Sequence, residues 1–357
     1  KAAELDNNPV TIYHWVRNNI EWIPTWGAQQ DADITLGSQR GNAFDQASLL
    51  IALLRAANIP ARYAQGVIEV EADRFRNWTG GFEDIDSAVA LASSGGIPLA
   101  PLTSGGAITK VQLEHVWVEA ALDYIPSQGA VNRTPDSWVP LDPSFKQYEF
   151  LEGLDPIEIA GINAEQLAQD FVDSGTVNEA ESWVTGFDPT ILENAQNQIQ
   201  TELETYIENN LTDPTVGEVI GGRQVIIQEF PAVPANLANP ILITGLRYAE
   251  VPTSLQQQLT LGFGISVSGF PINPITLPWS TINNRKLTLS FAPATPADEQ
   301  ALAALIPDDA QTIDDLPTTI SSNIRVLPEL KHNGELIHRG TSALKLGEEM
   351  MLFKQAI

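Results

Sequence analysis

The chain has 357 residues, of which 43% are hydrophobic and 18% are charged. This composition is typical of globular proteins and excludes a largely disordered chain. The 45 acidic and 19 basic residues give a formal charge of −26, which repels a phosphate backbone and excludes nucleic-acid binding. No apolar run in this segment is long enough to span a bilayer.

The sequence contains no cysteine. Disulfide bonds, thiolate-bound zinc and thiol catalysis are therefore excluded for the chain as written. We interpret the acidity as a solubility feature rather than as calcium binding. The length predicts two domains, and because the chain starts at Lys1 rather than Met we expect it to be a segment of a longer polypeptide.

Helical periodicity marks two segments near the N-terminus. In Pro9–Ile20, Ile12 and Val16 fall on one face, which predicts a short helix. Ala43–Ala57 is apolar almost all round, which predicts a helix buried in the core that stops before Pro60. Three strands are predicted after it: Arg62–Val70, Val111–Leu122 and Trp138–Leu141.

Residues 71–109 separate the first two of these strands and are interpreted as an insertion. They contain Trp78 and the glycine pairs Gly95-Gly96 and Gly105-Gly106. Long insertions in compact domains often form lids or binding loops, so a loop folded over a groove is one interpretation. A surface loop without a binding role explains the same residues equally well.

The pattern changes after Pro156. Helical spacing returns in Ile162–Val172 and Pro189–Leu211. Beyond them the chain alternates as strands, with one short helix among them. The predicted strands are Val225–Phe230, Leu242–Val251, Leu259–Val267, Lys286–Phe291, Ser322–Leu330 and Ala343–Phe353, and the helix is Pro296–Leu305.

Three motifs carry chemistry. They are Gly41-Asn42-Ala43-Phe44-Asp45-Gln46-Ala47 at the start of the buried helix, Glu114-His115-Val116-Trp117-Val118-Glu119 on a strand, and Trp138-Val139-Pro140-Leu141-Asp142-Pro143-Ser144 on another. Together they resemble the bacterial transglutaminase-like superfamily, which shares its architecture with papain-like cysteine proteases. In that family the motifs read Gly-x-Cys-x-Asp/Glu, His-x-Trp-x-Glu and Trp-x-x-Leu-Asp-Pro, in this order.

The resemblance implies an α+β fold with a papain-like transglutaminase core, in which the helix bearing the nucleophile position packs on an antiparallel sheet. Helices and a β-rich domain follow this core. We expect the core in residues 1–150, with its insertion at about 71–109, a helical bridging region in 151–222 and the β-rich domain in 223–357.

The family chemistry uses three residues. A cysteine at a helix N-terminus has a lowered pKa because it lies at the positive end of the helix dipole. A histidine pairs with the thiolate and later protonates the leaving amine, and a carboxylate orients the imidazole. The resemblance assigns the histidine to His115 and the carboxylate to Asp142, and the nucleophile position falls on Ala43.

An alanine methyl cannot attack an amide. Ser48 is rejected as a replacement because it lies five residues beyond Ala43, about 500° around the helix. Thr35 precedes the helix, and nothing in the sequence places it near His115. Trp117 and Trp78 are candidates for the substrate groove, although core packing is the simplest explanation of a strand tryptophan such as Trp117.

Ala43 leaves two explanations open. The natural protein carries alanine here and is a pseudoenzyme, or the alanine replaces a catalytic cysteine. The first describes a silent peptide- or amide-binding module, or a scaffold, of a large secreted or surface bacterial protein such as an RHS-type toxin. The second describes a transglutaminase or peptidase that acts on protein or peptidoglycan amides through a thioester. No nucleotide, zinc or EF-hand motif is found, so no cofactor is expected.

Overall fold

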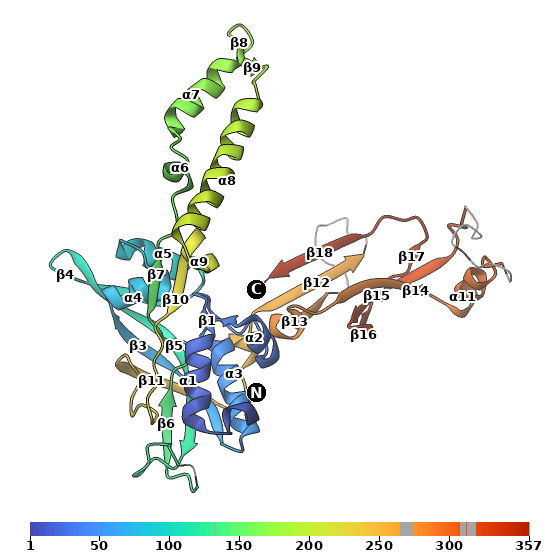
Figure 1. The fold of residues 1–357 in the computed structure, drawn as a ribbon. Coiled ribbons are helices and arrows are strands. Elements are labelled where there is room, and N and C mark those ends of the chain that lie inside the picture. The colour runs from blue at the N-terminus through green and yellow to red at the C-terminus, as the bar shows by residue number, and fades with distance from the viewer. Residues whose placement is uncertain (132, 265–273, 308–311, 313–318, 357) are drawn as a thin grey trace. The chain divides into compact units, whose positions relative to one another are not determined.

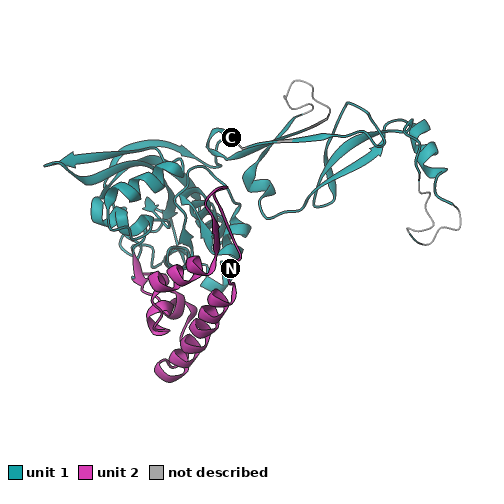
Figure 2. Cartoon of the chain, turned by 90° about the horizontal axis from the view of Figure 1, so that it is seen from above, with its two compact units in different colours: residues 1–147, 227–357 teal, residues 148–226 magenta. Residues whose placement is uncertain are grey.

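The computed structural model describes residues 1–131, 133–264, 274–307, 312 and 319–356 (Figure 1). Within these ranges helices and strands both contribute, as an α+β fold requires. The chain forms two compact units, residues 1–147 with 227–357, and residues 148–226 (Figure 2). No helix in the described ranges is long and apolar enough to cross a membrane.

The core of the first unit is a curled antiparallel sheet around one long strand. That strand, β5 (Ala107–Leu122), pairs with β3 (Ala61–Glu71), with β4 (Leu99–Ser104) and with β6 (Ser137–Leu141). The pairing of β5 with β6 brings Val118 opposite Leu141, so the segment that follows β6 emerges beside the middle of β5.

Helix α3 (Ala43–Ala56) is the central helix of this core and packs against β5. Its apolar sequence is explained by its burial, since Phe44, Leu50 and Leu54 have no exposed surface. Each such side chain contributes about 1.5–3 kcal/mol by leaving water. Helix α1 (Pro9–Asn19) packs on α3, and Asn8 caps its first turn by accepting from Val10 N at 2.9 Å.

The start of α3 is fixed by a network of hydrogen bonds around Asn42. The Asn42 side chain accepts from Asp45 N, and Asp45 accepts from Asn42 N in return, which is a capping box. The Asn42 amide also donates to Gly27 O at 2.7 Å and to Thr25 Oγ1 at 3.2 Å. A β-carbon on Gly41 would lie 2.8 Å from Asp45 Cβ, so this approach requires glycine. The first residue of α3 is therefore held to the neighbouring loop.

The predicted insertion is well structured. It contains α4 (Ala72–Thr79), α5 (Ile85–Ser94) and strand β4, and α4 packs against both β3 and β5. A hydrophobic side chain from α4, Phe75, is fully buried. The insertion thus packs on the core, and Trp78 lies on a helix rather than in a loop. A role of the insertion over a groove stays a prediction.

The core sheet is not made by residues 1–150 alone, which corrects our expectation. Strand β11 (Ile241–Tyr248) pairs antiparallel with β3 and forms an edge of the sheet. Sequence periodicity foresees a strand here but not its partner, because pairing between segments so far apart leaves no local signal. The division of the chain into domains at residues 150 and 222 stays a prediction.

A short parallel pair joins Glu21–Trp22 to Arg40–Gly41, and the described residues from 258 onward form two more sheets. One contains β12, β13 and β18, the other β14, β15, β16 and β17, and Leu259, Leu261, Ile282 and Leu330 form their buried cluster. The elements are β12 (Gln258–Gly264), β13 (Ile275–Pro278), α10 (Trp279–Ile282), β14 (Leu287–Pro293), α11 (Pro296–Ala303), β15 (Arg325–His332), β16 (Glu335–Arg339), β17 (Leu344–Lys345) and β18 (Met351–Ala356). The predicted strand at 259–267 runs beyond residue 264, where its last residues lie outside the described ranges.

The second unit, residues 148–226, is mainly helical. Its elements are β7 (Tyr148–Leu151), α6 (Pro156–Ile159), α7 (Ala164–Ser174), β8 (Thr176–Asn178), β9 (Trp183–Thr185), α8 (Thr190–Asn210), α9 (Val216–Ile220) and β10 (Gly222–Val225). A strand was predicted at Val225–Phe230, but the observed strand, β10, is shorter and ends at Val225. It pairs antiparallel with β7. Between Tyr148 and Gly222 the sequence has no lysine, arginine or histidine, so much of the chain's negative charge lies here.

The anchoring of α3 predicts a specific stability effect. Asn42→Ala removes the cap and the two hydrogen bonds that its amide donates, so the free energy of unfolding should fall by about 2 kcal/mol in urea denaturation. Asp84→Ala is the control, because Asp84 is an exposed N-cap of α5 that accepts a capping hydrogen bond from Ser87 N. We expect a loss of about 1 kcal/mol there. Equal losses in the two variants would contradict the network around Asn42.

Candidate active site

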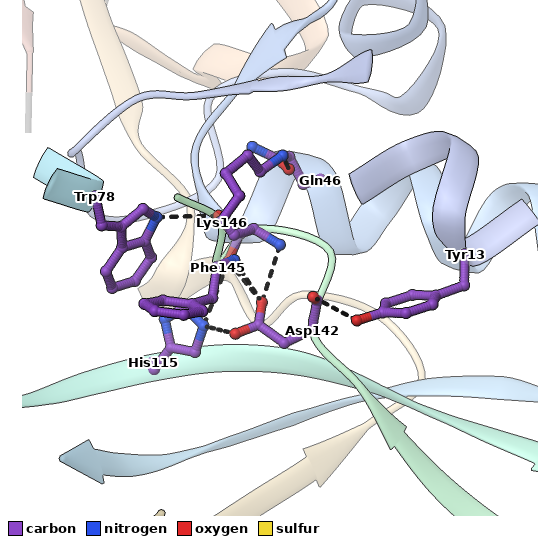
Figure 3. Close-up of polar contacts among 8 residues, drawn as sticks. Tyr13, Gln46, Trp78, His115, Asp142, Phe145 and Lys146 are labelled. Carbon is purple, nitrogen blue, oxygen red and sulfur yellow. Dashed lines mark hydrogen bonds and ion pairs between the residues drawn. The ribbon is translucent and has the colours of Figure 1, made fainter. Parts of the chain in front are cut away.

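His115 and Asp142 form a buried pair (Figure 3). His115 lies in the middle of β5 and Asp142 directly follows β6, so the pairing of these strands brings the two side chains together. His115 Nε2 lies 2.9 Å from Asp142 Oδ2, and the residues are 2% and 5% exposed. This distance lies within the range expected for a base and its orienting carboxylate.

The other oxygen of Asp142 is also fully engaged. Oδ1 accepts from Ser144 N at 2.9 Å, from Ser144 Oγ at 2.8 Å and from Phe145 N at 3.2 Å. Burial opposes ionisation of Asp142, but the charge of His115 and the hydrogen bonds from His115 and Ser144 outweigh it, so the pKa of this carboxyl is lowered. Asp142 is therefore an ionised acceptor at neutral pH.

The pair defines which nitrogen of the imidazole is basic. The imidazole has two hydrogen-bonded contacts, and both involve Nε2. One is with Asp142 Oδ2 and the other is with Ser144 Oγ, at 3.3 Å. An ionised Asp142 accepts the proton on Nε2, which leaves Nδ1 with the lone pair. Among the described residues no hydrogen bond to Nδ1 is found. The ring is thus oriented with the lone pair on Nδ1, the nitrogen that does not face Asp142.

Ala43 is the first residue of α3 and is 6% exposed. It lies at the positive end of a helix of 14 residues, where an anion is stabilised by the helix dipole. Because α3 packs against β5, the helix that carries Ala43 and the strand that carries His115 are neighbours. That Ala43 faces His115 stays a prediction, as do the catalytic roles of the three residues.

The two hydroxyl groups considered as substitutes are both engaged elsewhere. Ser48 Oγ donates to Phe44 O at 2.8 Å and accepts from the Tyr63 hydroxyl at 2.9 Å. Thr35 Oγ1 donates to Asp31 O at 2.9 Å. Neither contacts His115, in agreement with the sequence argument against them.

Asp45 has a structural role at the start of α3. Its Oδ1 accepts from Gln29 N and Gln30 N, both at 2.9 Å, in addition to the capping contact with Asn42. Burial raises the pKa of this carboxyl to about 6, although the three backbone hydrogen bonds lower it. The motif places Asp45 at the start of the helix, but nothing in the sequence indicates its anchoring of residues 29 and 30.

The tryptophans proposed for the groove are core residues. Trp78 in α4 is fully buried, stacks on Trp22 with ring centroids 4.0 Å apart, and lies edge-on to His115 at 5.5 Å. Its indole nitrogen donates to Ser144 O at 3.0 Å. Trp117 on β5 is also fully buried. Neither presents a surface to a ligand in this conformation, and Trp78 instead packs the base and the segment after Asp142 together.

A small cavity of about 120 Å³ lies beside the pair, with Tyr13, Arg74, Asp142 and Phe145 among its lining residues. Among the described residues, no group of three or more histidine or acidic side chains is placed to hold a metal ion.

Comparison with known families gives one match. Residues 2–143 match the family model described as Transglutaminase-like superfamily. The matched region contains α3, β5 and Asp142, so the chain carries a domain of this superfamily. Comparisons with curated proteins and with solved structures find no match.

The two buried carboxyl groups should titrate in opposite directions from the ordinary value of about 3.9. In a ¹³C NMR titration we expect Asp142 to titrate below that value and Asp45 at about 6. Asp142 therefore stabilises the fold above the unfolded pKa, and this contribution disappears as the pH falls through its folded pKa. For Asp45 the contribution is complete below the unfolded pKa and disappears as the pH rises through about 6. Titration of Asp142 above Asp45 would contradict the assigned contacts.

Proposed function

Because residues 2–143 form a transglutaminase-like domain, we propose that this chain is a catalytically silent member of that superfamily. The observation that carries the proposal is the combination of an oriented His115–Asp142 pair with a methyl group at the nucleophile position. A base without a nucleophile leaves only water attack, so the chain as written forms no thioester. Its role is then to bind a peptide or amide, or to serve as a scaffold.

The proposal extends to the setting of the domain. We place it in a large secreted or cell-surface bacterial protein, with a papain-like arrangement of helix and sheet. The support is the resemblance of the three motifs to modules found in such proteins, including RHS-type toxins. The lack of cysteine and the acidity of the chain are compatible with this setting. The partners would be a peptide or protein amide and neighbouring domains of the same polypeptide.

The alternative is a true transglutaminase or peptidase whose cysteine is replaced by Ala43. The retained orientation of His115 favours it, since Nδ1 is the basic nitrogen that such a thiol needs. The restored thiol would give its proton to Nδ1 and attack the amide carbon. The C–N bond would break, the amine would leave with the proton from the imidazolium, and the thioester would then be cleaved by water or by an acceptor amine.

Restoring the thiol separates these functions. If only the nucleophile is missing, the thiol introduced by Ala43→Cys should ionise below the unperturbed pKa of about 8.5 and react rapidly with iodoacetamide near neutral pH. The chain has no other cysteine, so the reaction reports on this site alone. Adding His115→Ala should slow it. The residue at this position in the natural gene then decides between a replaced cysteine and a natural alanine.

Ala164→Cys provides a matched control. Ala164 is the first residue of α7 and follows Asn163, an N-cap of the same residue type as Asn42, but it is exposed and no histidine lies in its segment. Its thiol therefore experiences the helix dipole alone. Equal alkylation rates for the two thiols, with no effect of His115→Ala, would exclude the disarmed enzyme and favour the scaffold role.

A further inference from the structure

A buried lysine, Lys146, lies between the segment that carries Asp142 and the start of α3. Lys146 follows Asp142 by four residues and has no exposed surface. Burying an ammonium group is costly unless it is hydrogen-bonded or paired. Its Nζ donates to Gln46 Oε1 at 2.9 Å and to the Ile20 carbonyl oxygen. Figure 3 shows Lys146 beside Gln46. Of these two acceptors, Gln46 lies on α3 and Ile20 is the C-cap of α1.

The contact of Lys146 with Gln46 continues to the start of α3. The Gln46 amide donates to Gly41 O at 2.8 Å and to Glu21 O at 3.3 Å. Gly41 directly precedes Asn42, the N-cap whose helix begins with Ala43. Gln46 has no exposed surface, so water does not compete for these hydrogen bonds.

The segment from Asp142 to Lys146 is also held by hydrogen bonds at its other end. Ser144 and Phe145 donate to Asp142 Oδ1, and the Ser144 carbonyl accepts from Trp78. Tyr13 of α1 donates to Asp142 O at 3.3 Å. Hydrogen bonds hold Ser144 and Phe145 to the carboxylate that orients His115, the backbone continues to Lys146, and hydrogen bonds of Lys146 and Gln46 then lead to Gly41, the residue before the cap of α3.

We propose that Lys146 is a positioning residue, which holds the Asp142 segment against the start of α3 and so sets the distance between His115 and the nucleophile position. This inference deepens the proposed function and rests on the assignment of His115, Asp142 and position 43. Lys146 does not touch the reacting atoms. It acts through the placement of Asp142 and of Gly41, and a bond of about 3 Å at each step leaves little freedom in that placement.

The test compares thiol ionisation in the Ala43→Cys protein with and without the lysine. Lys146→Met keeps the length of the side chain but removes its donors. We expect the pKa of the introduced thiol to rise toward about 8.5 and alkylation at pH 7 to slow about tenfold. Gln46→Met should have the same effect, and the two changes together should cost no more than either alone. Lys146→Arg, which retains donors and charge, should restore part of the rate.

Two controls separate positioning from stability. Lys110→Met removes a lysine of β5 that pairs with Glu69 at 2.7 Å and is partly exposed, and it should leave the thiol pKa unchanged. If Lys146→Met fails to fold, Gln46→Met still tests the path, because it keeps the bond of Lys146 to Ile20. A folded Lys146→Met protein whose thiol pKa is unchanged would overturn the proposal.

A second measurement distinguishes failure of this inference from failure of the proposed function. In the unchanged Ala43 chain, Lys146→Met should shift the ¹⁵N signals of the His115 ring and speed exchange of its Nε2 proton. This expectation holds whether or not the introduced thiol is reactive. If the thiol at position 43 is unreactive but Lys146→Met alters the His115 ring signals, the disarmed-enzyme alternative is excluded and the positioning role is supported. An unaltered ring signal overturns the positioning role.

Discussion

The carboxylate of Asp142 organises the site, since an ionised group with so little exposed surface is stable only if its lone pairs are satisfied. His115, Ser144 and Phe145 supply the hydrogen bonds, and they come from β5 and from the segment that follows β6. The pairing of β5 with β6 is therefore more than a sheet contact, because it fixes the tautomer of His115. Loss of the carboxylate would leave the imidazole buried without an orienting acceptor.

A second constraint acts on the other half of the site. The N-terminus of α3 is held by Asn42 and Asp45, which connect it to residues 25–30, and by Gln46, which connects it to Lys146. The helix dipole thus acts at the first turn of a buried helix, and this helix packs against the strand that carries the oriented imidazole. This arrangement is what thiolate chemistry needs. It persists around an alanine, which is why a disarmed enzyme and a silent binding module both fit the chain.

The sequence predicted the parts of this arrangement that have local signatures. The apolar run of Ala43–Ala56 and the motif around His115 specified a buried helix and a strand, and the structure places His115 beside Asp142. Lys146 was missed because its acceptors, Ile20 and Gln46, lie 126 and 100 residues away. The pairing of β11 with β3 and the burial of Trp78 were missed for the same reason, since both depend on tertiary contacts that periodicity does not encode. The turn of Asp142 and Ser144 had a usable signal in its Asp-Pro-Ser sequence.

The central claim is that the base, its carboxylate and the start of α3 form one catalytic geometry that lacks only a nucleophile. A crystal structure of the Ala43→Cys protein tests this claim most directly. We expect the introduced sulfur to lie about 3–4 Å from His115 Nδ1, while Nε2 remains bonded to Asp142. A sulfur beyond about 7 Å from the ring, or a ring whose Nε2 faces the sulfur, would exclude this geometry.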